Sequence, residues 1–315
     1  MLHGWIILDK PLGLRSTTAV SAVKRLLREA GEPKTKVGHG GTLDPLASGV
    51  LPIALGEATK LAGRMLDATK AYDFTIRFGE ETNTLDAEGQ VVVTSDVRPS
   101  TKEIEAILLR FTGAIEQLPP IYSALKIDGK PAYARARAGE QVDVKPRQVT
   151  VHGLDLRHPR ESGDPAEQEK VGSRFRGNDE VVEEITLSAT VSKGTYIRSL
   201  ARDIARALGT VGHVSYLRRT RAGPFTLEQA ISLDFLSEAA KARRIDGAVV
   251  PLVAALDDIP ALPVTPGQAQ LLRHGQRLAG FPAWPGLSLA TLEGTPVALV
   301  EALADGLKVV RGFNL

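Results

Sequence analysis

The spacing of apolar residues predicts two amphipathic helices. The first covers about residues 16–30, where apolar side chains recur every three or four positions after Ser16-Thr17-Thr18, a set of good N-cap residues. Gly31 is suited to end this helix as its C′ residue. The second helix covers residues 197–208 and ends at Gly209. In each helix the apolar positions fall on one side, so we expect that side to be buried.

Two segments alternate strictly between apolar and polar residues, which is the period of a half-buried strand. Residues 72–78 place an apolar side chain at every second position, beginning with Tyr72. Residues 185–192 show the same alternation and end at Lys193-Gly194. Residues 37–49 are rich in glycine and have neither period. We therefore predict an ordered loop at 37–49 and strands in the other two segments.

Two further stretches differ from this pattern. Residues 158–184 contain several glycines and prolines without a sustained apolar period, so we predict an exposed insertion between two strands. Beyond residue 250 prolines are frequent, and short apolar runs flank Asp305-Gly306, a strong hairpin signal. We expect a main domain at 1–250 that carries the insertion, and a small all-β domain at 251–315.

The composition is that of an ordinary soluble globular protein. Of the 315 residues, 43% are hydrophobic and 24% are charged, and the length favours two domains. The absence of cysteine excludes disulfides, thiolate nucleophiles and cysteine-ligated metal centres. The apolar run at 5–8 is too short for a signal sequence, and no stretch approaches the roughly 20 apolar residues that span a bilayer. We expect a cytoplasmic protein that does not contact a membrane.

The net charge of +2 conceals an uneven distribution. Basic residues are concentrated in the windows 15–36, 126–147 and 193–221, whose net charges are +4, +3 and +6, so the rest of the chain is acidic. This distribution favours a surface that binds a polyanion such as nucleic acid. Solvated lysines and arginines on ordinary helices would produce the same pattern.

Most familiar catalytic motifs are absent. The sequence has no Gly-x-Ser-x-Gly, no histidine pair spaced for zinc and no Gly-Lys-Ser/Thr of a phosphate-binding loop. Its distinctive segment is 38–52, which presents one carboxylate, Asp44, directly before Pro45. The preceding glycines would let the backbone approach a ligand closely, and Pro45 favours extended backbone angles at Asp44. The same pair is also a standard helix start, so the residues alone leave a capping role for Asp44 open.

Five ordered blocks together resemble the TruB-type tRNA pseudouridine synthases. They are Gly38-His39-Gly40-Gly41-Thr42-Leu43-Asp44 and its continuation to Pro52, Gly56-Glu57-Ala58-Thr59-Lys60, Lys70-Ala71-Tyr72, Pro120-Ile121-Tyr122-Ser123-Ala124-Leu125-Lys126, and Ser192-Lys193-Gly194-Thr195-Tyr196-Ile197-Arg198-Ser199-Leu200. The resemblance implies an α+β pseudouridine synthase fold, with a central mixed, mostly antiparallel sheet flanked by helices. It also implies a small C-terminal PUA-like domain that resembles a β-barrel.

The same resemblance implies an activity and its catalytic residues. The activity is the isomerisation of uridine to pseudouridine at position 55, in the TΨC loop of tRNA, without a metal or another cofactor. Asp44 matches the aspartate that helps break the bond between uracil N1 and ribose C1′. Arg198 matches the active-site arginine, and we expect it to form a bidentate ion pair with Asp44. Tyr72 matches the aromatic residue that stacks on the flipped uracil, and Tyr196 a second active-site tyrosine.

The residues that the resemblance assigns to RNA binding are His39, Lys60, Lys126, Arg135, Arg137, Leu217, Arg218 and Arg219. His39 matches a residue that inserts among the bases of the tRNA loop, and Lys60 and Leu217 match positions in the active-site wall. We expect phosphate contacts along the T-arm of tRNA, no obligatory protein partner and a monomer. Two alternatives stay open: a tRNA-folding chaperone without essential catalysis, and an RNA-guided relative that acts on other RNAs.

Overall fold

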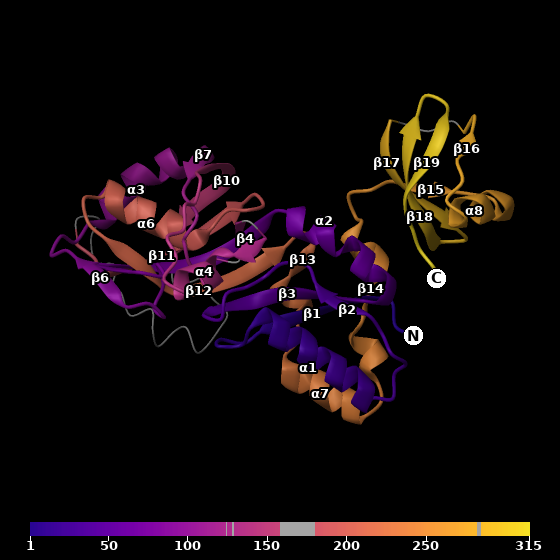
Figure 1. Ribbon diagram of the computed structural model, residues 1–315, viewed down its shortest axis with the longest axis horizontal. Coiled ribbons are helices and arrows are strands. Elements are labelled where there is room, and N and C mark those ends of the chain that lie inside the picture. Colours follow the sequence, from indigo (N-terminus) through magenta and orange to yellow (C-terminus); the bar gives the residue numbers. More distant parts are fainter. Residues whose placement is uncertain (124, 128, 158–179, 282–284) are drawn as a thin grey trace.

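The computed structural model describes residues 1–123, 125–127, 129–157, 180–281 and 285–315. In this part of the chain, helices pack on a long mixed sheet, and a smaller sheet stands at one end of the molecule (Figure 1). The strands of the long sheet are β1 (Gly4–Lys10), β2 (Val37–His39), β3 (Ala47–Leu55), β4 (Lys70–Phe78), β7 (Gly113–Gln117), β10 (Arg147–Leu156), β11 (Glu184–Val191), β12 (Gly212–Ala222), β13 (Phe225–Thr226) and β14 (Val250–Pro251).

The order of strands in the long sheet is β14-β1-β3-β12-β4-β11-β10-β7, with β2 paired to β3 and β13 paired to β12. Every pair is antiparallel except β3 with β12, which run parallel. The two strands predicted from alternation, at 72–78 and 185–192, are confirmed as β4 and β11, which lie side by side with Tyr72 opposite Ala189. The α+β fold with a mixed, mostly antiparallel sheet is confirmed.

The helices are α1 (Ser16–Glu29), α2 (Ala62–Asp67), α3 (Thr101–Leu108), α4 (Ala132–Arg137), α6 (Ile197–Ala207) and α7 (Leu233–Lys241), and the short 3-10 helices are η1 (Gly56–Leu61), η2 (Leu109–Phe111), η4 (Leu227–Gln229), η5 (Ile245–Ala248) and η6 (Leu252–Ala255). Two short hairpins complete the main part: β5 (Glu80–Thr82) with β6 (Val91–Thr94), and β8 (Lys126–Ile127) with β9 (Lys130–Pro131). No helix in the described ranges is long and apolar enough to cross a membrane.

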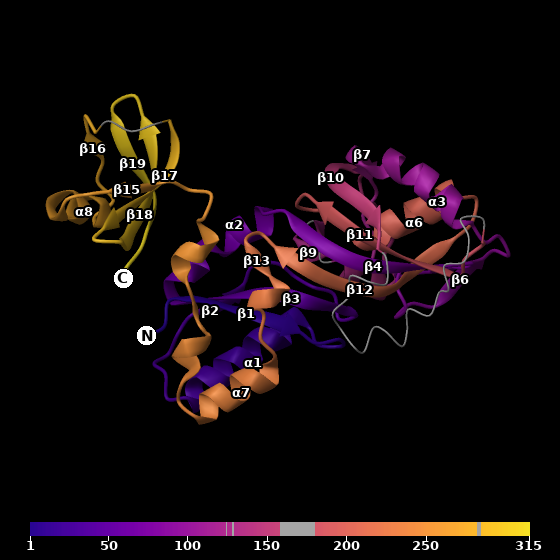
Figure 2. The same ribbon diagram turned by 180° about the vertical axis from the view of Figure 1, so that it is seen from behind.

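The long sheet is buried on both faces at β1, because alternate side chains join different cores. Ile6 and Leu8 belong to the larger core, which also includes buried side chains of α1, α3, α6 and α7. Trp5 and Ile7 belong to a second core, which reaches the C-terminal sheet through Leu289 and Leu299. Figure 2 shows α1 and α7 under one half of the sheet, with α3 and α6 at its other half.

Two sequence predictions for the N-terminal part need correction. The helix α1 is confirmed and Gly31 follows it with φ +84°, but its N-cap is Arg15, and Ser16 does not cap it. The Ser16 hydroxyl is instead bonded to the backbone of Leu43. The segment 37–49 is a loop only between His39 and Ala47, because both of its ends lie in strands. The strand β3 is buried almost throughout, so its apolar run does not alternate.

The C-terminal sheet is curled, in the order β15-β17-β18-β19-β16. Its strands are β15 (Ala261–Pro263), β16 (Leu278–Ala279), β17 (Gly286–Leu292), β18 (Thr295–Leu303) and β19 (Gly306–Gly312). The hairpin predicted at Asp305-Gly306 is confirmed, since it joins β18 to β19. The all-β prediction is wrong, because α8 (Pro266–Arg273) packs on this sheet. Its capping box joins Thr265 to Gln268 beside Pro266, a helix start that the frequency of proline concealed.

The C-terminal part also bears on the predicted domain division. The strand β14 lies at the proposed boundary and pairs with β1, so the long sheet extends to residue 251. The division into 1–250 and 251–315 stays a prediction.

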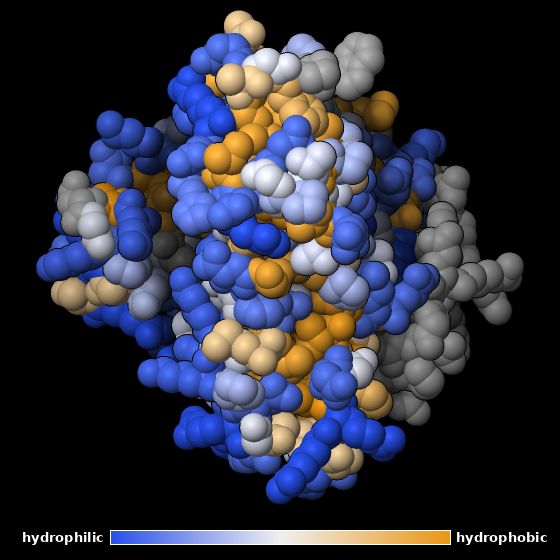
Figure 3. Space-filling view, turned by 90° about the vertical axis from the view of Figure 1, so that its right-hand side faces the viewer, coloured by the Kyte–Doolittle hydropathy of each residue, from blue (hydrophilic) through white to orange (hydrophobic). Residues whose placement is uncertain are grey.

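Viewed from the C-terminal side, hydrophilic side chains surround a band of hydrophobic ones (Figure 3). Of the predicted insertion, residues 158–179 lie outside the described residues.

Candidate active site

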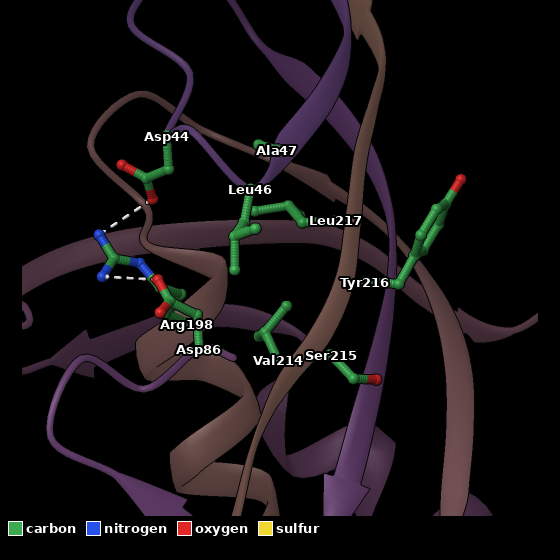
Figure 4. A pocket seen from close by; sticks show the side chains of 9 residues that line it. All are labelled: Asp44, Leu46, Ala47, Asp86, Arg198, Val214, Ser215, Tyr216 and Leu217. Atoms are coloured by element: carbon green, nitrogen blue, oxygen red, sulfur yellow. Dashed lines mark ion pairs between the residues drawn. The ribbon is translucent and has the colours of Figure 1, made fainter. Parts of the chain in front are cut away.

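Asp44 lies in the loop from Gly40 to Leu46, which we call the Asp44 loop, between β2 and β3. The loop ends where β3 begins to pair in parallel with β12, with Ala47 opposite Leu217. The Asp44 side chain is 38% exposed and lines a small pocket together with Arg198, Asp86 and Leu217 (Figure 4). The pocket has a volume of about 10 Å³, room for about one water molecule.

Arg198 is the centre of the charge arrangement in this pocket. Its Nη2 lies 2.9 Å from Asp44 Oδ2, and its Nη1 lies 3.2 Å from Asp86 Oδ2. The predicted contact between Arg198 and Asp44 is therefore present, but the prediction of a bidentate pair is wrong. The two terminal nitrogens bind different carboxylates (Figure 4), because Asp86 approaches the guanidinium from a second direction.

The Arg198 guanidinium is held firmly from several sides. Only 5% of its side chain is exposed. Besides the two carboxylates, it donates hydrogen bonds to the carbonyl oxygens of Thr84, at 2.8 Å, and Tyr122, at 3.0 Å. Its Nε has no hydrogen-bond partner among the described residues. Asp44 therefore meets a guanidinium whose position is set by contacts other than Asp44 itself.

The start of α6 delivers Arg198 to this position. The Gln117 amide holds the backbone of Tyr196, since Tyr196 N–H donates to Gln117 Oε1 at 2.8 Å and Gln117 Nε2 donates to the Tyr196 carbonyl at 3.1 Å. The Ser199 hydroxyl donates to the Leu118 carbonyl at 2.8 Å. These contacts tie the first turn of α6 to the residues around the end of β7.

Asp86 is a site residue that the sequence analysis missed. It lies in the turn between β5 and β6, where Leu85 has a left-handed backbone with φ 63°. Its Oδ1 accepts hydrogen bonds from Thr84 Oγ1, at 2.6 Å, and from Glu88 N–H, at 3.1 Å. Asp86 is thus fixed by its own turn while Oδ2 faces Arg198. The sequence around Asp86 indicates only a polar turn that ends at Gly89. It has no helical or strand period and matches no familiar motif, so nothing marked Asp86 as a site residue.

Asp44 and Asp86 differ in their exposure, although both pair with Arg198. Arg198 and Asp86 are both nearly buried, and a buried ion pair removes much of the cost of burying either charge alone. Asp44 is the more exposed of the two carboxylates and has no ion pair other than that with Arg198 among the described residues. Lys10 lies behind the loop, where burial lowers its pKa to about 8 although the Asp44 charge acts in the opposite direction.

The two predicted tyrosines lie outside the lining of the Asp44 pocket. Tyr72 is half-buried against the larger core and borders a separate pocket of about 320 Å³, together with Asp73 and Arg157. Tyr196 is half-buried immediately before α6. The guanidinium carbon of Arg147 lies 4.6 Å from the centre of the Tyr196 ring, a cation–π contact that the sequence analysis missed.

Leu217 and Lys60, which were matched to the active-site wall, and His39, which was matched to insertion among the tRNA bases, lie in different surroundings. Leu217 lines the Asp44 pocket. His39 is half-buried at the end of β2, and burial, followed by the charge of Arg219, holds its pKa below 6.5. Lys60 contacts the C-terminal sheet. Its Nζ lies 2.7 Å from Glu57 Oε2 and donates to the carbonyl of Gly312, the last residue of β19, at 2.9 Å.

Some of the residues predicted to bind phosphate are exposed, and others form an ion pair within the chain. Lys126 and Arg137 are exposed, and Arg137 lies 5.8 Å from the centre of the Tyr133 ring. Arg135, on the same helix α4, forms an ion pair with Glu140 at 2.7 Å.

The two adjacent arginines of β12 face their own chain. Arg218 is partly buried and binds Asp9 Oδ2 at 2.8 Å. Arg219 is only 1% exposed, and its guanidinium binds backbone carbonyl oxygens. This burial argues against the prediction that the Arg219 side chain contacts RNA. Within the described ranges, no group of histidine, aspartate and glutamate is arranged to hold a metal ion.

Sequence comparisons identify relatives over the whole chain. A sequence profile of the TruB family pseudouridylate synthase N-terminal domain matches residues 24–197, and one of the tRNA pseudouridylate synthase B C-terminal domain matches residues 198–257. The tRNA pseudouridine synthase B of Novosphingobium aromaticivorans is 56% identical over 315 residues, which cover 100% of this chain and 98% of that protein. The corresponding protein of Zymomonas mobilis is 56% identical over 313 residues, covering 99% and 96%.

Solved structures agree with this result. The crystal structure of a Cbf5-Nop10-Gar1 complex contains a chain with a TM-score of 0.69 and 27% identity, covering 99% of this chain and 85% of that one. A chain of an H/ACA RNP bound to a substrate RNA has the same TM-score at 24% identity, which speaks for the fold alone. With both profiles matched in order and full-length relatives at 56% identity, this chain belongs to the TruB family of pseudouridylate synthases.

Proposed function

We propose that this chain isomerises uridine to pseudouridine in tRNA, at position 55 in the TΨC loop, and that Asp44 is the residue that performs the chemistry. The relatives named tRNA pseudouridine synthase B support tRNA as the substrate. The observation that carries the assignment of Asp44 is its ion pair with Arg198: a partly exposed carboxylate held at 2.9 Å by a buried guanidinium.

The reaction requires no co-reactant. The bond between uracil N1 and ribose C1′ breaks, the base turns, and C5 bonds to C1′. The proton on C5 is then lost to a base or to water, and N1, which has lost its bond to C1′, takes up a proton. Asp44 acts on the sugar or the base while the glycosidic bond is broken, either as a nucleophile or by stabilising positive charge on the sugar. Arg198 binds Oδ2 of Asp44, so Oδ1 of Asp44 would be the oxygen available to the substrate.

The tyrosines are proposed as the aromatic part of the site. Tyr72 would stack on the flipped uracil, and Tyr196, supported by Arg147, would take a place beside the sugar or base. Stacking contributes roughly 1–3 kcal/mol per base, which offsets much of the cost of extruding a nucleotide. The pocket at Asp44 has only about 10 Å³, so we expect its apolar wall at Leu46 and Leu217 to move when the base enters.

The RNA-binding surface is proposed from exposed charge. Lys126 and Arg137 would contact phosphates of the T-arm, and His39, whose pKa is lowered by burial, would enter the loop as a neutral ring. Phosphate contacts position an RNA without selecting it, so the shape of the loop would supply specificity. We further propose a cytoplasmic monomer with catalytic residues in 1–250 and a PUA-like RNA-binding unit at 251–315.

The decisive experiment uses the purified chain and unmodified tRNA transcripts that carry tritium at C5 of uridine. We expect one equivalent of tritium to be released per tRNA, and none from a transcript whose uridine 55 is replaced by cytidine. An isolated T-arm hairpin should react as well, which would exclude an obligatory guide RNA or protein partner. Release that persists in the cytidine transcript would refute position 55, and no release from any tRNA would refute the activity.

A further inference from the structure

Arg219 is unusual among the arginines of this chain because it is completely buried without a carboxylate partner in the described residues. It lies on β12 and is 1% exposed. Its Nε donates to the Val50 carbonyl at 2.7 Å, its Nη2 to the Gly41 carbonyl at 3.1 Å, and its Nη1 to the Thr42 carbonyl at 3.5 Å. Buried arginines are normally paired with acids, so backbone carbonyls from a single segment are a distinctive set of acceptors.

These acceptors lie on both sides of Asp44. Gly41 and Thr42 precede Asp44 in the Asp44 loop, and Val50 follows it in β3. A guanidinium is planar and presents its donors in fixed directions, so one side chain sets the distance and the angle between the two ends of the loop. A lysine has a single nitrogen on a flexible stem and does not reproduce this geometry.

Two glycines near Asp44, one in the Asp44 loop and one in β3, allow the backbone to pass close to Arg219. Gly41 has φ +144°, a backbone conformation that favours glycine, and a Cβ there would lie at an ordinary contact distance of 3.4 Å from Arg219 Nη1. Gly49 has φ +98°, and a Cβ there would lie 2.2 Å from the Arg219 carbonyl oxygen. Gly41, one of the glycines expected to let the backbone approach a ligand, thus lies against a side chain of the same protein, and Gly49 lies against the backbone of β12.

Two further side chains hold the peptides next to Asp44. The Ser16 hydroxyl accepts from Leu43 N–H at 2.9 Å and donates to the Leu43 carbonyl at 3.0 Å. Lys10 Nζ donates to the Pro45 carbonyl at 3.3 Å. The peptides directly beside Asp44 therefore have their own partners, whereas Gly41 and Thr42, at the upstream end of the loop, are held by Arg219.

We propose that Arg219 is a positioning residue for catalysis, which holds the Asp44 loop so that the carboxylate meets Arg198 and the substrate at the correct place. This inference rests on the proposed function, since it assigns Arg219 a part in the reaction of Asp44. Arg219 itself touches neither RNA nor the reacting atoms, because it is buried behind the loop. A displacement of about 1 Å in a catalytic group is enough to lower a rate by about 100-fold.

The test compares Arg219→Lys with the unsubstituted protein. We expect the single-turnover rate of pseudouridine formation in tRNA to fall by about 100-fold, while the dissociation constant for tRNA stays within about twofold. The dependence of binding on salt should keep its slope, because no phosphate contact is removed. Hydrogen exchange should become faster in a peptide that covers residues 40–48 and stay unchanged in peptides from the C-terminal sheet.

Arg98→Lys is the matched control. Arg98 also donates to backbone carbonyls, those of Ser95 at 2.8 Å and Val97 at 3.2 Å, and in addition pairs with Glu183 at 2.6 Å, in a loop away from Asp44. This variant should exchange faster near residues 95–98 and retain its rate within about twofold. Arg219→Met is a second test variant, and if it does not fold, the lysine variant alone decides.

Two results would overturn the proposal. One is a folded Arg219→Lys protein that reacts at the unsubstituted rate. The other is a loss of affinity as large as the loss of rate, with a shallower salt dependence in Arg219→Met, which would make Arg219 an RNA contact. Failure of the proposed function would look different, because the unsubstituted protein would then form no pseudouridine, while the exchange experiment would still report whether Arg219 holds the loop.

Discussion

Two segments of this chain have similar numbers of basic residues, seven in 193–221 and six in 126–147, but several of these residues differ in exposure. In residues 193–221, Arg198, Arg202 and Arg219 are all less than a tenth exposed, and they bind carboxylates or carbonyls of their own chain. In residues 126–147, Lys126 and Arg137 are exposed. The comparison teaches that the net charge of a segment does not reveal which charges reach solvent. Interior charges organise the Asp44 site, whereas surface charges are available to an RNA.

We expect the largest effect from Asp44→Asn, which tests whether the charges around Asp44 serve catalysis. The amide keeps the shape of the side chain but loses its charge and its nucleophilic oxygen, so we expect the rate of tritium release from tRNA to fall below about one-thousandth of the unsubstituted value. Binding of tRNA, measured by filter retention, should persist. Retained turnover would remove Asp44 from the mechanism and would favour a chaperone whose function does not depend on catalysis.

Arg198→Lys should produce the next largest effect. A lysine keeps the charge but cannot serve Asp44 and Asp86 from separate nitrogens, so we expect a loss of about 100-fold in the single-turnover rate with little change in affinity. Arg206→Lys is the matched control on the same helix, because Arg206 pairs with Glu81 at 2.7 Å and is 56% exposed. Equal losses of rate and affinity in Arg198→Lys would make Arg198 a binding residue.

The double variant Lys126→Ala and Arg137→Ala tests whether the exposed basic side chains of residues 126–147 bind RNA. Removal of two exposed charges should weaken tRNA binding about 10-fold at physiological salt and leave the rate at saturating tRNA unchanged. The slope of log affinity against log salt should become shallower by roughly 0.7–0.9 for each lost phosphate contact. An unchanged slope would show that these side chains do not contact phosphates, and the basic segment would then be an ordinary solvated surface.

The smallest expected effect concerns the pH dependence of stability at Lys70. Burial, followed by the charge of Arg219, lowers the pKa of Lys70 to about 8, and its Nζ donates to the carbonyls of Leu66 and Ala68. Between pH 8 and 10.5 the unfolded chain binds a proton at Lys70 that the folded chain has lost, so rising pH favours folding.

The measurement is the free energy of unfolding in urea at pH 7.5 and pH 9 for the unsubstituted protein and for Lys70→Met. The difference between the two proteins should shift by about 1 kcal/mol in favour of the unsubstituted one over this range. A difference that does not change with pH would show that Lys70 titrates near its ordinary pKa of 10.5 and that burial does not disfavour its charge.

Local patterns in the sequence determined much of the architecture. The periods of 3.6 and 2 marked α1, α6, β4 and β11, because apolar side chains recur on one side of each element. The period did not show that α6 is buried on nearly all sides, including at Arg198 and Arg202. The Asp305-Gly306 turn located the hairpin of β18 and β19. The ordered motifs around Asp44 and Arg198 were sufficient to indicate the family, and the contact between these two side chains followed from that resemblance.

Only the tertiary structure decided which side chains meet across distant segments. Asp86 reaches Arg198 from a turn without a distinctive pattern, and Gln117 reaches Tyr196 from the end of another strand. Arg219 looked like a phosphate contact because a charge in a strand carries no local sign of burial. Its carbonyl acceptors lie about 170 residues earlier in the chain, on strands and loops that become neighbours only when the sheet assembles. The charge of a residue and the spacing of apolar residues can be read from the chain. The burial of a side chain and its bonding partners are set only when the sheet assembles.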